Sequence, residues 1–418
     1  MDSGRAESAA RARAAPASHP GQAGRVCKIG LSMSHPAPPT PVFAAGTPSA
    51  ATPAAASATS AAVDWPDARR RAAFEAWLAP LVAPHGLQPA SLRPASSDAS
   101  FRRYLRIDAV AAGTSFIVMD APPDKEPCAS FVQVQALLQQ AGLHAPDILA
   151  WDQAHGFILM SDLGTHTVID MLDPERPQDA YAWYQQATDT LLQWQLASRP
   201  GVLPPYDEAL LRRELALFPD WYVAKHRGTT LDAAQRAVLD HAFNRIVAHN
   251  LAAPSVYVHR DFMMRNLMVP QQSGGPLGVL DFQDAVYGPI TYDIASLARD
   301  AFISWDEEFV LDITVRYWEK ARKAGLLGAD SPTGWGGDFG EFYRSVEWMG
   351  LQRHLKVAGV FARITLRDGK PKYLADAPRF LHYIRATTDR YRELGPLRKL
   401  IDQIEGTEEA IGYAFGRV

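Results

Sequence analysis

The sequence predicts an α+β fold with two lobes: a small lobe built on a sheet and a larger lobe that is mainly helical. Between residues 65 and 163, short apolar runs of strand length surround a single helical pattern. From residue 164 to residue 418, long patterns of helical periodicity dominate. We therefore place the boundary between the lobes near Ser161-Asp-Leu-Gly164, and the first 64 residues belong to neither lobe.

The first 64 residues differ in composition from the rest of the chain. Residues 45–58, for example, are only Ala, Pro, Ser, Thr and Gly. Such a segment cannot bury enough apolar surface to offset the entropy of ordering the chain. We therefore expect a disordered tail over residues 1–64.

The composition of the whole chain indicates a globular protein. Of its 418 residues, 47% are hydrophobic and 21% are charged, and the formal net charge is −4. That balance does not favour a nucleic-acid partner, and no apolar run reaches the roughly 18 residues that a membrane span needs. The two cysteines, Cys27 and Cys128, are far apart and suit a reducing compartment. We expect a cytoplasmic monomer with no membrane partner.

The small lobe is predicted to open with a helix and to continue as strands around a second helix. Asp64 is a plausible N-cap, and apolar residues follow at helical spacing as far as Leu81. The later elements are strands at 101–107 and 115–119, a helix around 131–138, and strands at 148–151 and 156–160.

The large lobe is predicted from longer patterns. Tyr181–Gln195 and Leu231–His249 have helical periodicity, and the chain after Tyr292 is helical except for a glycine-rich break at 334–340. Two short apolar runs, 256–258 and 277–280, interrupt the helices, and a polar cluster follows each run.

These polar clusters carry the chemistry. The first, His259-Arg-Asp-Phe-Met-Met-Arg-Asn266, places Asp261 and Asn266 five residues apart, and Asp281 follows fifteen residues later. Phosphoryl transfer from ATP needs a group that accepts the hydroxyl proton and ligands that hold Mg²⁺ against the phosphates. Asp261 can accept the proton, while Asn266 and Asp281 can bind the metal. The spacing of these three residues is that of the kinase pattern.

The segment Leu280–Leu297, with its Asp-Phe-Gln-Asp start, resembles the aminoglycoside phosphotransferase and choline kinase superfamily. The catalytic segment, together with Leu351–Arg363 and the small-lobe motifs 98–104 and 119–126, is most similar to bacterial N-acetylmuramate/N-acetylglucosamine anomeric kinases. The resemblance extends over about residues 65–400. It implies a bilobal protein-kinase-like fold with ATP and Mg²⁺ between the lobes, and phosphorylation of an amino sugar at its anomeric hydroxyl in peptidoglycan recycling.

The resemblance also implies that Asp293 would brace the catalytic loop. We expect His259 to be a structural hydrogen-bonding residue and not an acid or base. From their order along the chain, Ser161 and Leu163 are predicted to belong to the linker that binds the nucleotide.

The small lobe departs from the general kinase pattern at the phosphates. The predicted phosphate-binding loop, Ser96–Phe101, contains no glycine, so we expect the hydroxyls of Ser97 and Ser100 to contact the phosphates instead. The strand Phe116–Asp120 has no lysine at the place where kinases carry one. Arg103 or Lys125 is predicted to supply that charge.

The sequence predicts phosphoryl transfer but leaves several acceptor substrates open. Residues 344–399 contain 13 Lys and Arg but 5 Asp and Glu, which suits an uncharged or carboxylate-bearing sugar better than a polycationic aminoglycoside. Candidate substrate contacts are Asp284, Arg299, Arg353, His354 and Arg363. Two alternatives stay open: another small alcohol as acceptor (an aminoglycoside, choline or homoserine), or a nucleotide-binding pseudokinase.

Overall fold

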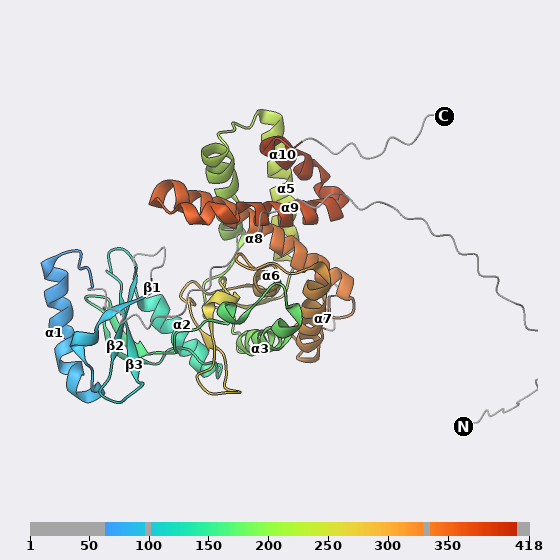
Figure 1. Ribbon diagram of the computed structural model, residues 1–418. Helices are drawn as coiled ribbons and strands as arrows, with labels where there is room; N and C mark the ends of the chain where they lie inside the picture. Colours follow the sequence, from blue (N-terminus) through green and yellow to red (C-terminus); the bar gives the residue numbers. More distant parts are fainter. Residues whose placement is uncertain (1–62, 97–101, 329–334, 408–418) are drawn as a thin grey trace, which may run out of the picture. The chain divides into compact units, whose positions relative to one another are not determined.

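The computed structural model describes residues 63–96, 102–328 and 335–407 (Figure 1). Most of the predicted tail therefore lies outside the described residues. The α-helices are α1 (Ala68–His85), α2 (Ala129–Gln140), α3 (Pro177–Leu196), α4 (Glu208–Leu215), α5 (Ala233–Leu251), α6 (Thr291–Ala298), α7 (Glu307–Lys323), α8 (Phe339–Asp368), α9 (Ala377–Arg390) and α10 (Gly395–Glu405). The strands are β1 (Arg93–Ser96), β2 (Arg103–Asp108), β3 (Ser115–Asp120), β4 (Ile148–Asp152), β5 (Phe157–Ser161), β6 (Ser255–Val258), β7 (Leu267–Met268), β8 (Gly278–Val279) and β9 (Val286–Pro289).

The first five strands form one antiparallel sheet in the order β1-β2-β3-β5-β4. The alternation of side chains along β2 assigns the two faces of this sheet. Leu105 and Ile107 are buried in a cluster with Phe74 and Leu78 of α1. The opposite face meets α2, so that the sheet lies between the two helices (Figure 1).

The start of the sheet lobe differs from the sequence-based prediction in two details. The N-cap of α1 is Asp67, whose side chain accepts from the Arg70 N–H, and not Asp64. The edge strand β1 was not predicted, because its sequence Arg-Pro-Ala-Ser carries no apolar alternation.

The rest of the described chain is mainly helical and is organised around α8, a helix of 30 residues that contacts α5, α6, α9 and a π-helical segment at Phe218–His226. Gly359 allows one of these contacts, because a Cβ there would lie 2.3 Å from the carbonyl oxygen of Leu217. Two short strand pairs, β6 with β9 and β7 with β8, lie outside the main sheet.

The predicted α+β class, with an antiparallel N-terminal sheet and a helical remainder, is confirmed. In the residues that the structure describes, none of the helices is both long and apolar enough to cross a membrane.

Candidate active site

The segment from His259 to Asn266 connects β6 to β7, and the pairing of β7 with β8 brings its end against Asp281. The Leu280 N–H donates to the Asn266 carbonyl at 2.9 Å. The Asn266 amide nitrogen donates to the Asp261 carbonyl at 2.8 Å and lies 3.3 Å from Asp281 Oδ2. Two short strand pairs therefore bring together the three residues that the sequence analysis selected for chemistry.

The loop is held in a backbone conformation that side chains disfavour. Arg260 has φ 76° and Asp281 has φ 63°, both in the left-handed region, which costs about 1–2 kcal/mol for a residue with a Cβ. Asp293, at the start of α6, offsets part of this cost because its carboxylate accepts from the N–H of His259 at 2.7 Å and of Arg260 at 3.0 Å. Asp293 thus contacts the loop that it is predicted to brace.

Burial sets the charge states of the two support residues. Asp293 is completely buried, and burial raises the pKa of its carboxyl to about 7 even though both backbone N–H groups favour the ionised form. Burial lowers the pKa of His259 to about 4, so the imidazole is neutral at pH 7. Its Nδ1 accepts from the Asp261 N–H at 3.3 Å, which fits a structural residue better than a proton carrier.

A second buried carboxylate, which was not predicted from the sequence, supports the loop. Asp300 follows α6, has no exposed surface, and accepts from the N–H of Met264 at 3.2 Å and of Phe302 at 2.8 Å. The bond to Phe302 is an Asx turn, and an Asp directly after a helical pattern is the local signal that predicts one. The bond to Met264 joins residues 36 positions apart, so the tertiary fold alone reveals it.

Asn266 and Asp281 fit a Mg²⁺ site. Because the Asn266 amide nitrogen donates to Asp261, its oxygen Oδ1 remains as a possible ligand beside the Asp281 carboxylate. Gln283 donates to Asp281 Oδ1 at 2.9 Å and orients that carboxylate. Mg²⁺ in phosphoryl-transfer sites takes one or two protein oxygens of this kind and completes its shell with phosphates and water.

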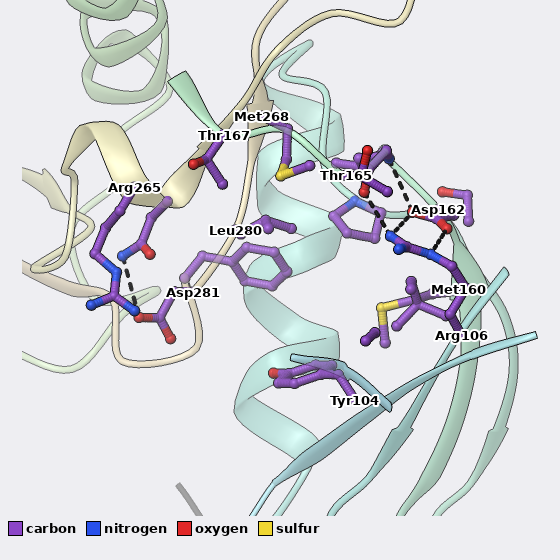
Figure 2. A pocket seen from close by; sticks show the side chains of 18 of the residues that line it. Tyr104, Arg106, Met160, Asp162, Thr165, Thr167, Arg265, Met268, Leu280 and Asp281 are labelled. Atoms are coloured by element: carbon purple, nitrogen blue, oxygen red, sulfur yellow. Dashed lines mark hydrogen bonds and ion pairs between the residues drawn. The ribbon is translucent and has the colours of Figure 1, made fainter. Parts of the chain in front are cut away.

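A pocket of about 310 Å³ extends from this site to the segment that follows β5. Asp281 and Arg265 lie on one side of it, and Asp162 and Arg106 lie on the other (Figure 2). Its walls are mostly apolar and come from both parts of the chain; they include Ile117, Phe131, Met160, Met268, Leu280 and Phe282. The predicted linker residues Ser161 and Leu163 both line it.

An ion pair closes the linker side of the pocket. Arg106 Nε lies 2.5 Å from Asp162 Oδ2, and its NH2 group donates to the Gly164 carbonyl at 2.7 Å. Ser115 donates to the same carboxylate at 2.6 Å. These bonds tie the linker to β2 and β3, and sequence reasoning did not find them.

Arg102 and Arg103, where β2 begins, pair with different carboxylates. Arg103 pairs with the buried Asp120 and lies over the Trp65 ring, so it sits on the α1 face and does not line the pocket. Arg102 precedes β2, pairs with Glu126 at 2.9 Å, and does not line the pocket either. Ser97 and Ser100 lie outside the described residues.

The five candidate substrate contacts are not brought together in one open site. Asp284 is exposed beside the metal-binding residues, and Arg363 is half-buried on α8. Arg353 and His354 are each 2% exposed, and Arg353 contacts Met263 Sδ at 2.9 Å. Arg299 pairs with Glu307, and its carbonyl lies 3.3 Å from His354 Nε2. Three of the five therefore have interior or ion-paired positions, Arg299 and His354 line one small pocket, and a role of these residues in binding sugar stays a prediction.

Comparisons with known proteins are consistent with this geometry. The model of the phosphotransferase enzyme family matches residues 91–326. An N-acetylmuramate/N-acetylglucosamine kinase of Neisseria meningitidis serogroup B is 48% identical over 323 residues, which are 77% of this chain and 93% of that protein. A kinase with the same name from Pseudomonas aeruginosa is 48% identical over 322 residues, which are 77% of this chain and 91% of that protein.

Solved structures support the fold at low identity. A choline/ethanolamine kinase family protein from Mesorhizobium loti has a TM-score of 0.52 at 14% identity and covers 80% of this chain and 99% of its own. A choline kinase from Streptococcus pneumoniae has a TM-score of 0.52 at 11% identity and covers 76% of this chain and 100% of its own.

Proposed function

Because this chain belongs to the phosphotransferase enzyme family, we propose that it transfers the terminal phosphoryl group of ATP to the anomeric hydroxyl of N-acetylmuramate or N-acetylglucosamine. The observation that carries the choice of acceptor is the 48% identity to kinases named for these two sugars, over more than nine-tenths of their length. The product, a sugar 1-phosphate, would serve in peptidoglycan recycling.

Asp261 is the proposed base. It stands on a loop that Asp293 and Asp300 hold at three backbone N–H groups, so its carboxylate is positioned before a substrate arrives. In the reaction it would orient the sugar hydroxyl and accept its proton, and positioning of this kind accounts for much of the rate enhancement in phosphoryl transfer.

Asn266 and Asp281 are the proposed metal ligands. A bound Mg²⁺ would offset the negative charge of the phosphates. This chain's contribution is the pair of oxygens held beside Asp261 and the orientation of Asp281 by Gln283.

The pocket beside these ligands is the proposed nucleotide site. Its apolar walls suit a flat base, and the linker residues from Ser161 to Gly164 offer backbone groups along its edge. Ile117 occupies the pocket face of β3, where kinases carry a lysine.

The test is ADP release with Mg·ATP in the presence of N-acetylmuramate, N-acetylglucosamine, kanamycin or choline. Turnover on the two amino sugars, with an acid-labile phosphate product, is expected. Turnover on kanamycin or choline alone would overturn the acceptor and keep the catalytic residues. No ADP with any acceptor would favour the pseudokinase alternative, which the absence of a lysine on β3 supports.

Asp261→Asn tests the proposed base directly. We expect turnover to fall by about 10³-fold or more while the affinity for ATP changes little, because the carboxylate acts on the acceptor hydroxyl. A variant that keeps wild-type turnover would exclude Asp261 as the base.

A further inference from the structure

Two cations and one carboxylate form a buried cluster directly beside Asp261. Arg260, the residue before the proposed base, places its NH2 group 2.5 Å from Glu214 Oε1 of α4. Lys356 of α8 places Nζ 3.1 Å from that same oxygen. The other oxygen of Glu214 accepts from the hydroxyl of Tyr206. A single carboxylate oxygen therefore lies between two positive groups from distant parts of the chain.

The charge of this cluster does not balance. Glu214 is the one carboxylate in ion-pair contact with Arg260 or Lys356 within the described ranges, so the three side chains together carry one excess positive charge. The tyrosines around it, Tyr206 and Tyr292, add no negative charge, because burial raises the pKa of each phenol. Asp261 also acts on the two cations and raises the pKa of both, but it forms no ion pair with either in the described ranges, so a bound anion would still add a direct contact.

Lys356 remains charged in this position. Burial is the largest single influence and would lower its pKa, but Glu214 and the other acidic groups around it, Asp261 among them, together outweigh burial, and the pKa is raised. Its ammonium donates to the Tyr292 hydroxyl at 3.1 Å and lies over the Tyr292 ring at 5.7 Å. At least one of its three N–H groups has no acceptor in the described part of the chain.

The two cations of the cluster are partly exposed, and the cluster lies outside the nucleotide pocket. The side chains of Lys356 and Arg260 are 14% and 18% exposed, whereas Glu214 is 5% exposed, so the cations are the groups that a ligand can reach. None of the three lines the pocket that we assign to the nucleotide. Asp261 is close enough to raise the pKa of both cations.

The two proposed sugars differ in the feature that such a cluster recognises. N-acetylmuramate carries an ether-linked lactyl group that ends in a carboxylate, and N-acetylglucosamine has a hydroxyl in its place. We propose that Lys356 and Arg260, held by Glu214, form the subsite for the lactyl carboxylate of N-acetylmuramate. This inference rests on the proposed function, and it assigns to the cluster the preference between the two acceptors.

Lys356→Met tests the subsite by a ratio of rates. The variant keeps the Arg260–Glu214 pair, so the buried carboxylate retains a partner. We expect kcat/KM for N-acetylmuramate, divided by kcat/KM for N-acetylglucosamine, to fall by at least about tenfold, mainly through KM, because a charge-assisted contact to one acceptor is lost. Lys356→Arg should restore most of the ratio.

Lys320→Met is the matched control, because Lys320 pairs with Asp189 at 2.6 Å on helices that do not contribute to this cluster. It should leave the ratio unchanged. An equal loss on both sugars in Lys356→Met would overturn the proposal and show that the cluster supports Asp261 or the fold. An unchanged ratio would overturn it as well.

The neutral lactyl amide of N-acetylmuramate gives a second test that does not depend on a variant that folds. Wild-type enzyme should use the amide at least about tenfold less efficiently than the acid, and Lys356→Met should treat the two alike. Equal use of acid and amide by the wild type would refute the subsite. If the wild type phosphorylates neither N-acetylmuramate nor N-acetylglucosamine, the proposed function itself fails, which is a different result.

Discussion

Asp293→Asn is expected to lower kcat and, at high pH, to raise the free energy of unfolding, so it separates the two effects of this buried carboxylate. The carboxylate of Asp293 accepts the N–H groups of His259 and Arg260 and holds Arg260 at φ 76°. An amide of the same shape has one oxygen, and its NH₂ group faces a backbone donor. One loop N–H therefore loses its acceptor, and the loop that carries Asp261 is free to relax. A displacement of about 1 Å at a catalytic group costs about 10²-fold in rate, which is the loss of kcat that we expect.

At high pH, Asp293→Asn is expected to raise the stability of the fold although it lowers kcat. Because burial raises the pKa of Asp293 from 3.8 to about 7, the folded state binds this proton more tightly than the unfolded state does. The penalty for ionising the carboxyl is small below the unfolded pKa, grows as the pH rises, and is complete above about pH 7. Between pH 5 and pH 8 it amounts to about 3 kcal/mol. Asparagine has no such penalty.

The assay is urea unfolding of wild type and Asp293→Asn at pH 5 and pH 8, together with kcat at pH 8. Relative to wild type, the variant should gain about 3 kcal/mol of stability between pH 5 and pH 8 while kcat is about 10²-fold lower. An unfolding difference that is the same at both pH values would refute the pKa argument. A kcat within threefold of wild type would refute the positioning argument.

Three further predictions concern acid stability, packing and the metal. Burial lowers the pKa of His354 to about 3, so its imidazole stays neutral in the folded state. The stability that this neutral imidazole contributes is complete above 6.5, its pKa in the unfolded chain, and is lost as the pH falls. In urea unfolding, His354→Gln should therefore reduce the loss of stability between pH 7.5 and pH 5 by about 2 kcal/mol. An equal loss in both proteins would contradict this. Gly359→Ala should destabilise the protein by about 1–3 kcal/mol, because the new Cβ would meet the Leu217 carbonyl oxygen at 2.3 Å, whereas Gly395→Ala, with open space around its Cβ, should leave the melting temperature nearly unchanged. Chelation of divalent cations should abolish ADP release and added Mg²⁺ should restore it, and activity that persists in EDTA would exclude the metal role of Asn266 and Asp281.

The sequence by itself was sufficient for the lobe order and for the proximity of the three proposed chemical residues. The small lobe could be predicted because strands and helices have different hydrophobic periods, and each pattern is local. Asp261 and Asn266 share one short loop, so their proximity needed no tertiary information. Asp281 follows a short apolar run, and the pairing of that run with the strand after Asn266 was the single long-range step.

Tertiary structure decided which charged side chains reach the site. Arg103 and Tyr104 are neighbours in sequence, yet alternation along β2 sends them to opposite faces, and only the packing of α1 shows that Arg103 faces away from the pocket. Arg353 and His354 are polar residues in a helical pattern, and the sequence alone did not predict that they are buried. Other helices surround α8 and cover both side chains.

The cluster of Glu214, Arg260 and Lys356 is the clearest case of charged residues whose contacts could not be predicted from the sequence. Its members lie on α4, the catalytic loop and α8, and no local pattern connects residues 46 and 142 positions away from Glu214. Local sequence determines which backbone pattern forms, because propensity and periodicity act over a few residues. The partner of a buried charge is determined by which segments the core brings together, and that is a property of the folded chain alone.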